Sequence, residues 1–227
     1  MQPIPPLPPL NQLVQQVQSL TNTPALYAVG IGAFVVVAAR DWRLVLGGFT
    51  AITLGSALLT TTLLPPEWAL VRVIVGGLVA IMWYLSAQRA GWGGYFLPFR
   101  RQGGVMARPL SSTTLFRTLL ALALAGGLLA TRPRLPLPPL PADVQALVVW
   151  LGAFALLGLA LGDEALQAGV ALLMWLAATQ ILFAALQRDA WLIWLLSTVE
   201  LLVGLATAYL IIARGPAVGQ PPEGTNR

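Results

Sequence analysis

The residue best suited to chemistry in this sequence is Glu200, which lies near the middle of a long apolar segment, Ala190–Ala213. An ionisable side chain inside a membrane segment is costly, and it commonly marks an ion path, a proton relay or a buried charge pair. Thr179 and Gln180, in the preceding apolar segment, are expected at a similar depth and are candidate partners. Arg72 stands near the end of its own segment, so we expect it to lie too far away to pair with Glu200. Two interpretations stay open: a proton-relay carboxylate, or a protonated or paired acid that holds helices together.

Few other residue types in the sequence could support catalysis or ligand binding. The 227 residues include no Cys and no His, which excludes thiol and imidazole nucleophiles, disulfides and Cys/His metal sites. There is no glycine-rich phosphate loop, no pair of catalytic carboxylates and no nucleophile–base pair. We therefore expect no metal, no cofactor and no catalytic activity in this chain. A complete proton path needs several protonatable groups, and the apolar segments around Glu200 supply none.

Seven apolar segments must position these residues. A hydrocarbon layer about 30 Å thick needs roughly 20 helical residues, and backbone groups inside it must be satisfied within helices or closed barrels. The composition, 57% hydrophobic and 9% charged, is far from that of a soluble domain. Long runs without strict alternation favour helices. The sequence predicts an all-α integral membrane protein with seven transmembrane helices: Pro24–Ala39, Leu44–Leu64, Trp68–Ala87, Thr113–Ala130, Ala146–Leu161, Ala165–Leu186 and Ala190–Ala213.

The basic residues between these segments predict an orientation in a cell inner (cytoplasmic) membrane. All 13 basic residues are Arg; nine lie on one side of the predicted membrane and four on the other. Because cytoplasmic loops carry the excess of Arg and Lys, we expect the N-terminus outside and the C-terminus in the cytoplasm. These arginines set topology, so the pI near 10.7 does not indicate nucleic-acid binding. The short loop 162–164 is acidic on the predicted cytoplasmic side, although acidic residues contribute little to this rule.

The chain divides into five predicted parts. They are a Pro-rich N-terminal segment (1–23), a first three-helix repeat (24–90), a loop with the fourth helix and a Pro-rich connection (91–145), a second three-helix repeat (146–214) and a disordered tail (215–227). The loop after the first repeat is rich in Gly and aromatic residues and carries Arg100, Arg101 and Arg108. It is interpreted either as an interfacial loop with an aromatic belt or as a docking surface for a partner or for acidic lipid headgroups.

The two three-helix parts share a pattern. Asp41 precedes the second helix and Asp163 precedes the sixth, an offset of 122 residues, while Trp68 and Trp191 open the third and seventh helices at an offset of 123. A single helix between the triplets gives both the same direction across the membrane. We therefore predict parallel repeats related by rotation about the membrane normal, with the fourth helix as the link.

Three stretches carry a resemblance to a known family: Ala39-Arg40-Asp41-Trp42-Arg43-Leu44, Leu151-Gly152-Ala153-Phe154-Ala155-Leu156-Leu157-Gly158 and Ala208-Tyr209-Leu210-Ile211-Ile212-Ala213-Arg214. With the helix number, the isolated fourth helix and the length, they resemble hydrogenase 4 component E. That family is itself similar to a duplicated K subunit of respiratory complex I and to the MrpC-type antiporter subunit.

The resemblance implies a non-catalytic, cofactor-free membrane subunit of an energy-converting, ion-translocating redox complex. Its partners would be the lipid bilayer and antiporter-like membrane subunits, beside which it scaffolds or lines a proton path. The family has a carboxylate in the penultimate helix of its three-helix unit, whereas 170–180 has none, so only Glu200 is carried over. The alternatives are a self-contained small-solute transporter, or an accessory subunit of another respiratory or photosynthetic assembly.

Overall fold

The computed structural model describes residues 10–63, 65–92, 112–131, 133, 142–186 and 190–214. These residues form seven α-helices and contain no strand. The helices, in chain order, are α1 (Leu10–Ala38), α2 (Trp42–Leu63), α3 (Pro66–Arg89), α4 (Ser112–Thr131), α5 (Ala142–Leu161), α6 (Ala165–Leu186) and α7 (Ala190–Arg214). From α2 to α7, each runs within a few residues of its predicted bounds.

The helices have the length and composition of a multi-pass membrane protein. Six of them, α2 to α7, are long and apolar enough to cross a bilayer. The apolar part of α1, Pro24–Ala38, is shorter. The outward surface is correspondingly apolar, with exposed side chains such as Ile74, Leu122 and Leu202, as lipid-facing helices require. The predicted all-α integral membrane fold is confirmed.

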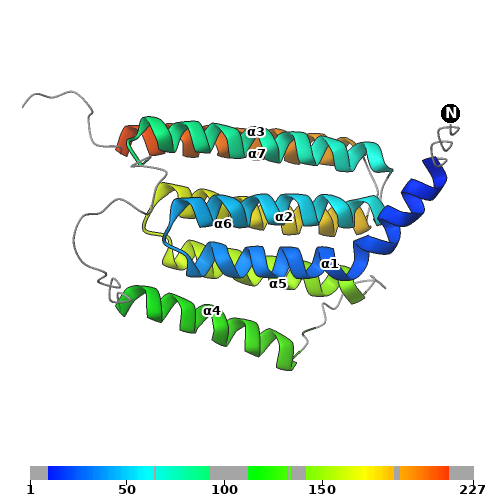
Figure 1. Ribbon diagram of the computed structural model, residues 1–227, viewed down its shortest axis with the longest axis horizontal. Coiled ribbons are helices and arrows are strands. Elements are labelled where there is room, and N and C mark those ends of the chain that lie inside the picture. The colour runs from blue at the N-terminus through cyan, green and yellow to red at the C-terminus, as the bar shows by residue number, and fades with distance from the viewer. Residues whose placement is uncertain are drawn as a thin grey trace, which may run out of the picture.

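Helix α1 differs most from the sequence prediction, which began the helix at Pro24. The helical backbone begins at Leu10 and continues through Pro24. Residues 10–23 contain no Pro and several good helix formers, so helix can form ahead of the apolar part. Pro24 removes one intrahelical hydrogen bond and commonly kinks a helix, and α1 bends in its N-terminal part (Figure 1).

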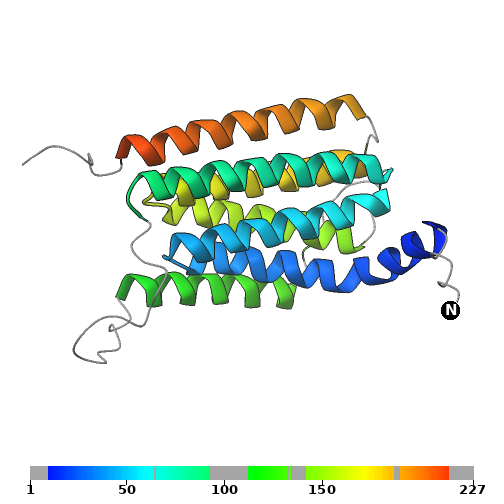
Figure 2. The ribbon, with the colours of Figure 1, turned by 45° about the horizontal axis from the view of Figure 1, so that its top comes forward.

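The two helix triplets form two stacked layers. One layer holds α1, α2 and α3, and the other holds α5, α6 and α7 (Figures 1 and 2). Across the layers, α1 packs on α5, α2 on α6 and α3 on α7. The single crossing by α4 gives both triplets the same direction across the membrane, and the contacts show that the helices also follow the same order in both layers. Like helices therefore lie opposite one another across the two layers, while superposition of the triplets by rotation about the membrane normal stays a prediction.

Close approach between helices depends on glycine where backbones nearly touch. A Cβ on Gly48 would lie 2.9 Å from the carbonyl oxygen of Gly32, and a Cβ on Gly32 would lie 2.8 Å from that of Gly48. These distances leave no room for a side chain where α1 meets α2. The α1–α2 contact is more extensive than the α2–α3 contact of the same layer. By contrast, Gly126 and Gly127 of α4 face open space.

Helix α4 stands apart from the two layers. It packs mainly against α1 and α5, and in Figure 1 it diverges from α5 toward its C-terminal end. Only 11% of the most apolar 18-residue stretch of α4 is buried inside the protein, whereas 56% of the corresponding stretch is buried in α2 and in α6. Almost all of its apolar surface therefore faces away from the bundle.

Candidate functional site

Glu200 lies in the interior between the two layers. It is the eleventh residue of α7, ten residues after Ala190, which places it about 15 Å along the helix axis. Its side chain is only 5% exposed. The apolar segment that carries it supplies length and hydrophobicity for a membrane crossing, while its buried face turns Glu200 toward α6 rather than toward lipid.

The partner of Glu200 on α6 is Gln180. The Gln180 side-chain amide donates from Nε2 to Glu200 Oε2 at 3.3 Å, and Gln180 is 3% exposed. The other end of the same amide accepts a hydrogen bond, because Arg72 Nη1 lies 2.5 Å from Gln180 Oε1. An amide offers a donor on one side and an acceptor on the other. Gln180 therefore joins a guanidinium to a carboxylate.

Arg72 comes from α3 and is buried, with 6% of its side chain exposed. Its Nε donates to Ser56 Oγ of α2 at 2.9 Å. Ser56 in turn donates to the backbone carbonyl oxygen of Thr53, 3.0 Å away. The four side chains Ser56, Arg72, Gln180 and Glu200, hereafter the buried network, thus come from four helices, two in each layer.

The buried network satisfies charges that would otherwise be very unfavourable at this depth. A charged side chain at the centre of a membrane helix costs about 2.5–3.5 kcal/mol on insertion scales. Opposite charges joined through Gln180 offset part of that cost, since Coulomb attraction is strong in a low-dielectric interior. Because the hydrogen bond from Arg72 to Gln180 crosses from α3 to α6, this compensation also holds the two layers in register.

The structure brings together some of the predicted residues and not others. Gln180 is a partner of Glu200, as the sequence suggested. Thr179 is not, because its hydroxyl donates to the carbonyl oxygen of Leu176 in its own helix at 2.8 Å. Within the described residues Arg72 makes no direct contact with Glu200, as the sequence led us to expect, but Gln180 connects the two side chains. Arg72 starts only about 9 Å from the beginning of α3, but its long side chain extends to Gln180 and so connects with the acid.

Three predicted interface residues, Arg100, Arg101 and Arg108, lie outside the described residues.

A second buried arginine lies at the opposite end of the bundle. Arg117 of α4 is 5% exposed and donates from Nη1 to Gln167 Oε1 of α6 at 2.8 Å. Its Nη2 forms an ion pair with Asp163 Oδ2 at 2.8 Å and also donates to the backbone carbonyl oxygen of Leu161. It therefore ties α4 to the end of α5 and the start of α6. This cluster escaped the sequence analysis, although a glutamine inside an apolar helix is a signal that a polar partner is near.

The acidic loop before α6 is explained by this contact. The sequence placed Asp163 on the same side as most arginines without a basic residue in its own loop. Arg117 supplies the missing positive charge from α4, a separation of 46 residues. Among the described arginines, Arg40, Arg43, Arg89, Arg117 and Arg214 all lie at this end of the bundle, hereafter the basic end.

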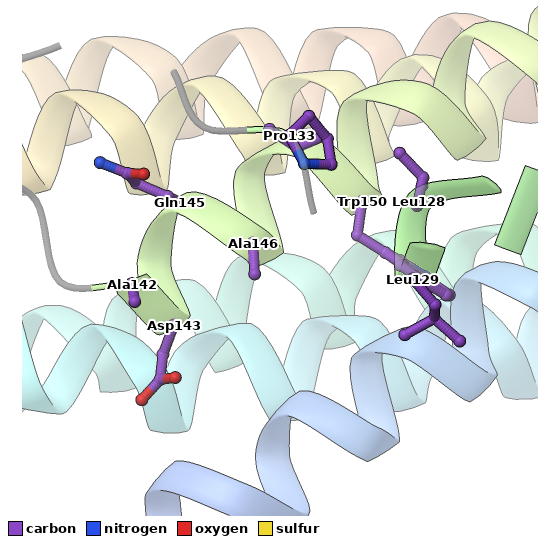
Figure 3. Close-up of a pocket in the computed structure, with 9 residues that line it drawn as sticks. Leu128, Leu129, Pro133, Ala142, Asp143, Gln145, Ala146 and Trp150 are labelled. Carbon is purple, nitrogen blue, oxygen red and sulfur yellow. The ribbon is translucent and has the colours of Figure 1, made fainter. Parts of the chain in front are cut away.

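Two cavities adjoin the C-terminal end of α4, and neither has the chemistry of an active site. One, of about 430 Å³, lies between the ends of α4 and α5, where Asp143 and Gln145 extend to different sides of α5 (Figure 3). The other, of about 490 Å³, is lined by apolar residues of α1, α4 and α5 that include Tyr27 and Phe34. Trp150 borders both cavities. Converging polar groups mark catalytic pockets, and these walls lack them.

The chemistry open to the buried network is the gain or loss of a proton by Glu200 and the exchange of hydrogen bonds through Gln180 and Ser56. Among the described residues, no group of three His, Cys, Asp or Glu side chains is placed to hold a metal ion. A carboxylate fixed by one amide and balanced by one guanidinium is suited either to relay a proton or to lock two helix layers together.

In comparisons with known proteins, no family model, no curated protein and no solved structure matches the chain.

Proposed function

We propose that this chain is a non-catalytic membrane subunit of an energy-converting, ion-translocating redox complex of the hydrogenase 4 or complex I kind. In it, the chain would scaffold or line a proton path next to antiporter-like subunits. The observation that carries the proposal is the buried network of Arg72, Gln180 and Glu200, because ionisable groups at membrane depth mark ion paths and proton relays.

A subunit role fits the buried network better than a self-contained transporter does. Glu200 is the one carboxylate among the described residues that is buried within the bundle. A continuous proton path needs further protonatable groups, which neighbouring subunits would have to supply. A solute transporter would need a polar cavity near mid-membrane, and the two cavities at the C-terminal end of α4 are mostly apolar.

The exposed surface of α4 supports an assembled role. Its outward face carries large apolar side chains, among them Leu115, Phe116, Leu119, Leu122 and Leu129. The N-terminal end of α4 is fixed to the bundle by the hydrogen bonds of Arg117 to Gln167 and Asp163. A helix that is anchored at one end and almost fully exposed along its length offers an antiporter-like partner a broad apolar surface.

The proposed orientation places the basic end in the cytoplasm and the N-terminus outside the cell inner membrane. It rests on the excess of arginine at that end. Single cysteines at Ser19, Ser112 and Gly219 of this Cys-free chain test it with a membrane-impermeant thiol reagent. In intact cells Ser19→Cys should be labelled while Ser112→Cys and Gly219→Cys should not. The opposite pattern would overturn the orientation.

Purification from native membranes tests the subunit role. A tagged chain should co-purify in a large detergent-stable assembly with antiporter-like subunits and a redox catalytic subunit. A chain that purifies alone, and that transports a solute after reconstitution, would instead establish the transporter alternative.

Glu200→Gln tests the proton path in that assembly. If Glu200 relays protons, the assembly should stay intact while ion translocation falls, since Gln cannot carry the proton. Glu164→Gln, at an exposed acid of the basic end, is the matched control and should not change translocation. If Glu200→Gln translocates ions as well as the wild type, Glu200 does not relay protons and the scaffold role remains. Glu200→Leu would then test the scaffold role, because it should weaken assembly.

A further inference from the structure

Two grooves occupy equivalent positions at the basic end of the two layers. The first, of about 390 Å³, lies between α2 and α3 and is lined by Trp42, Arg43, Leu46, Gly47, Thr50, Tyr84 and Gln88. The second, of about 490 Å³, lies against α6 and α7, and its lining includes Glu164, Ala165, Ala168, Gly169, Leu172 and Thr207.

The register of the sequence relates these two grooves. The 122-residue offset takes the five α2 residues of the first groove to residues 164, 165, 168, 169 and 172, all of which line the second. An offset of 123 takes Tyr84 to Thr207 in the same way. The grooves are therefore counterparts, and the differences between them identify what is particular to each.

The charges of the two grooves differ. In the first groove, Arg43 is exposed, and its guanidinium carbon lies 5.4 Å from the ring centroid of Trp42. The Trp42 ring also lies 5.9 Å from that of Tyr84. In the second groove, the counterparts of Trp42 and Arg43 are Glu164 and Ala165, and Asp163 adds another acid. One groove is basic and aromatic, whereas the other is acidic at its mouth.

The shapes of the grooves differ at their shared glycine. A Cβ on Gly47 would meet no atom within 4 Å, so the floor of the first groove is open. A Cβ on Gly169 would lie 2.5 Å from Thr207 Oγ1, so α7 closes the second groove at that position.

The structure also fixes the aromatic wall of the first groove. Trp42 Nε1 donates to the backbone carbonyl oxygen of Trp92, 3.2 Å away. Trp92 reaches this place because Gly91 adopts a φ of +75°, which ends α3 and is a conformation that glycine tolerates without strain. The Trp42 ring is thus held from the α3 end while Arg43 stacks on it.

We infer that the groove lined by Trp42, Arg43, Gly47 and Tyr84 binds the headgroup of an anionic phospholipid in the leaflet at the basic end. Arginine matches the geometry of a phosphate group. Tryptophan and tyrosine occupy the headgroup level of membranes, and basic residues there attract anionic lipids. The acid nearby, Asp41, accepts the backbone N–H of Arg43 at 3.0 Å and is not part of the groove lining. This inference is independent of the proposed function.

Native mass spectrometry of the full-length chain in detergent tests the inference. Phosphatidylglycerol and phosphatidylcholine with identical acyl chains are titrated separately, and the bound lipid is counted. The wild type should retain phosphatidylglycerol in preference to phosphatidylcholine. Arg43→Gln should weaken phosphatidylglycerol binding about fivefold, which is the effect expected from one basic residue near a membrane surface. Gly47→Leu fills the groove without removing charge and should weaken binding to a similar degree.

Arg214→Gln is the matched control, because it removes one positive charge from the second groove at the same end of the bundle. It should leave phosphatidylglycerol binding unchanged. Equal losses in Arg43→Gln and Arg214→Gln would mean diffuse charge attraction and would overturn the site. Equal retention of the two lipids by the wild type, or full binding by Gly47→Leu, would overturn it as well. Retained helicity and a monodisperse elution profile check that each variant is folded.

Discussion

Arg72 and Arg117 are both buried, and each donates a hydrogen bond to a different glutamine of α6. The acidic residues with which the two arginines are associated lie in different surroundings. Arg117 contacts Asp163 directly, at 2.8 Å, and the Asp163 side chain is 79% exposed. Arg72 is connected to Glu200 through Gln180, and Glu200 is 5% exposed. Gln167 and Gln180 lie 13 residues apart on α6, about 20 Å along its axis. One helix thus organises polar contacts at two depths.

Because one arginine–acid contact lies at the surface and the other in the interior, the two should contribute differently to the free energy of unfolding. Water can solvate Asp163 if its partner is lost, so the ion pair at the basic end resembles a surface pair, which contributes about 0.2–1 kcal/mol. Glu200 has no such alternative in the interior. Removal of one partner from a buried pair leaves an uncompensated charge and costs about 3–5 kcal/mol. The same chemical motif therefore serves to tether α4 at the surface and to couple the layers in the interior.

The largest effect is expected when the two arginines are replaced in turn by leucine. Arg72→Leu leaves Glu200 without its counter-charge and should lower the free energy of unfolding by about 3–5 kcal/mol. Arg117→Leu removes hydrogen bonds to Gln167 and Leu161 but leaves Asp163 hydrated, so about 1–3 kcal/mol is expected. Denaturant-induced unfolding in mixed micelles, followed by circular dichroism, measures both. Equal losses would show that depth does not separate the two sites.

A double-mutant cycle tests whether Arg72 and Glu200 are coupled although Gln180 stands between them. The double variant Arg72→Leu/Glu200→Leu should be less destabilised than the sum of the two single variants, by about 0.5–3 kcal/mol, since no charge remains unpaired. Arg72→Leu combined with Asp163→Asn provides the control cycle, in which the effects should add. Additive losses in both cycles would mean that Arg72 does not compensate Glu200.

The sequence predicted the helices well and their packing poorly, for a physical reason. The helices can be recognised in the sequence by their length and apolar composition. Glu200 and Gln180 stand out because polar residues are rare in such segments. The neighbours of each helix are not encoded in the same way. Membrane helices are apolar on lipid-facing and protein-facing sides alike, so hydrophobic periodicity does not tell which faces meet. This is why the stacking of α1 to α3 on α5 to α7 required the structure.

The reach of arginine side chains was also hidden in the sequence. Position along a helix gives the depth of the backbone, and from depth alone Arg72 lay too near the end of α3 to join Glu200. Its long side chain and the intervening Gln180 close that gap. The partners of Arg117 lie 44 to 50 residues away in sequence, beyond any local pattern.

An intermediate effect is expected for the two glutamines. Gln180→Leu leaves two buried groups, Arg72 and Glu200, without their shared hydrogen-bond partner and should cost about 1–3 kcal/mol. Gln167→Leu removes one of the contacts of Arg117 while Asp163 and Leu161 remain, so a loss of about 0.5–1.5 kcal/mol is expected. The same unfolding measurement compares them. A larger loss for Gln167→Leu would contradict the greater weight assigned to the buried network.

The smallest effect is expected for Asp163→Asn. Because Asp163 is largely exposed, its ion pair with Arg117 should contribute no more than about 1 kcal/mol. Salt screens exposed charges, with a Debye length of about 10 Å at 0.1 M and about 3 Å at 1 M. Raising the salt concentration across that range should therefore lower the stability of the wild type slightly and should affect Asp163→Asn less. Glu164→Gln, which removes the adjacent exposed acid, is the control and should keep the wild-type salt response. A loss of several kcal/mol in Asp163→Asn, insensitive to salt, would show that this pair behaves like a buried one and would remove the contrast between the two arginines.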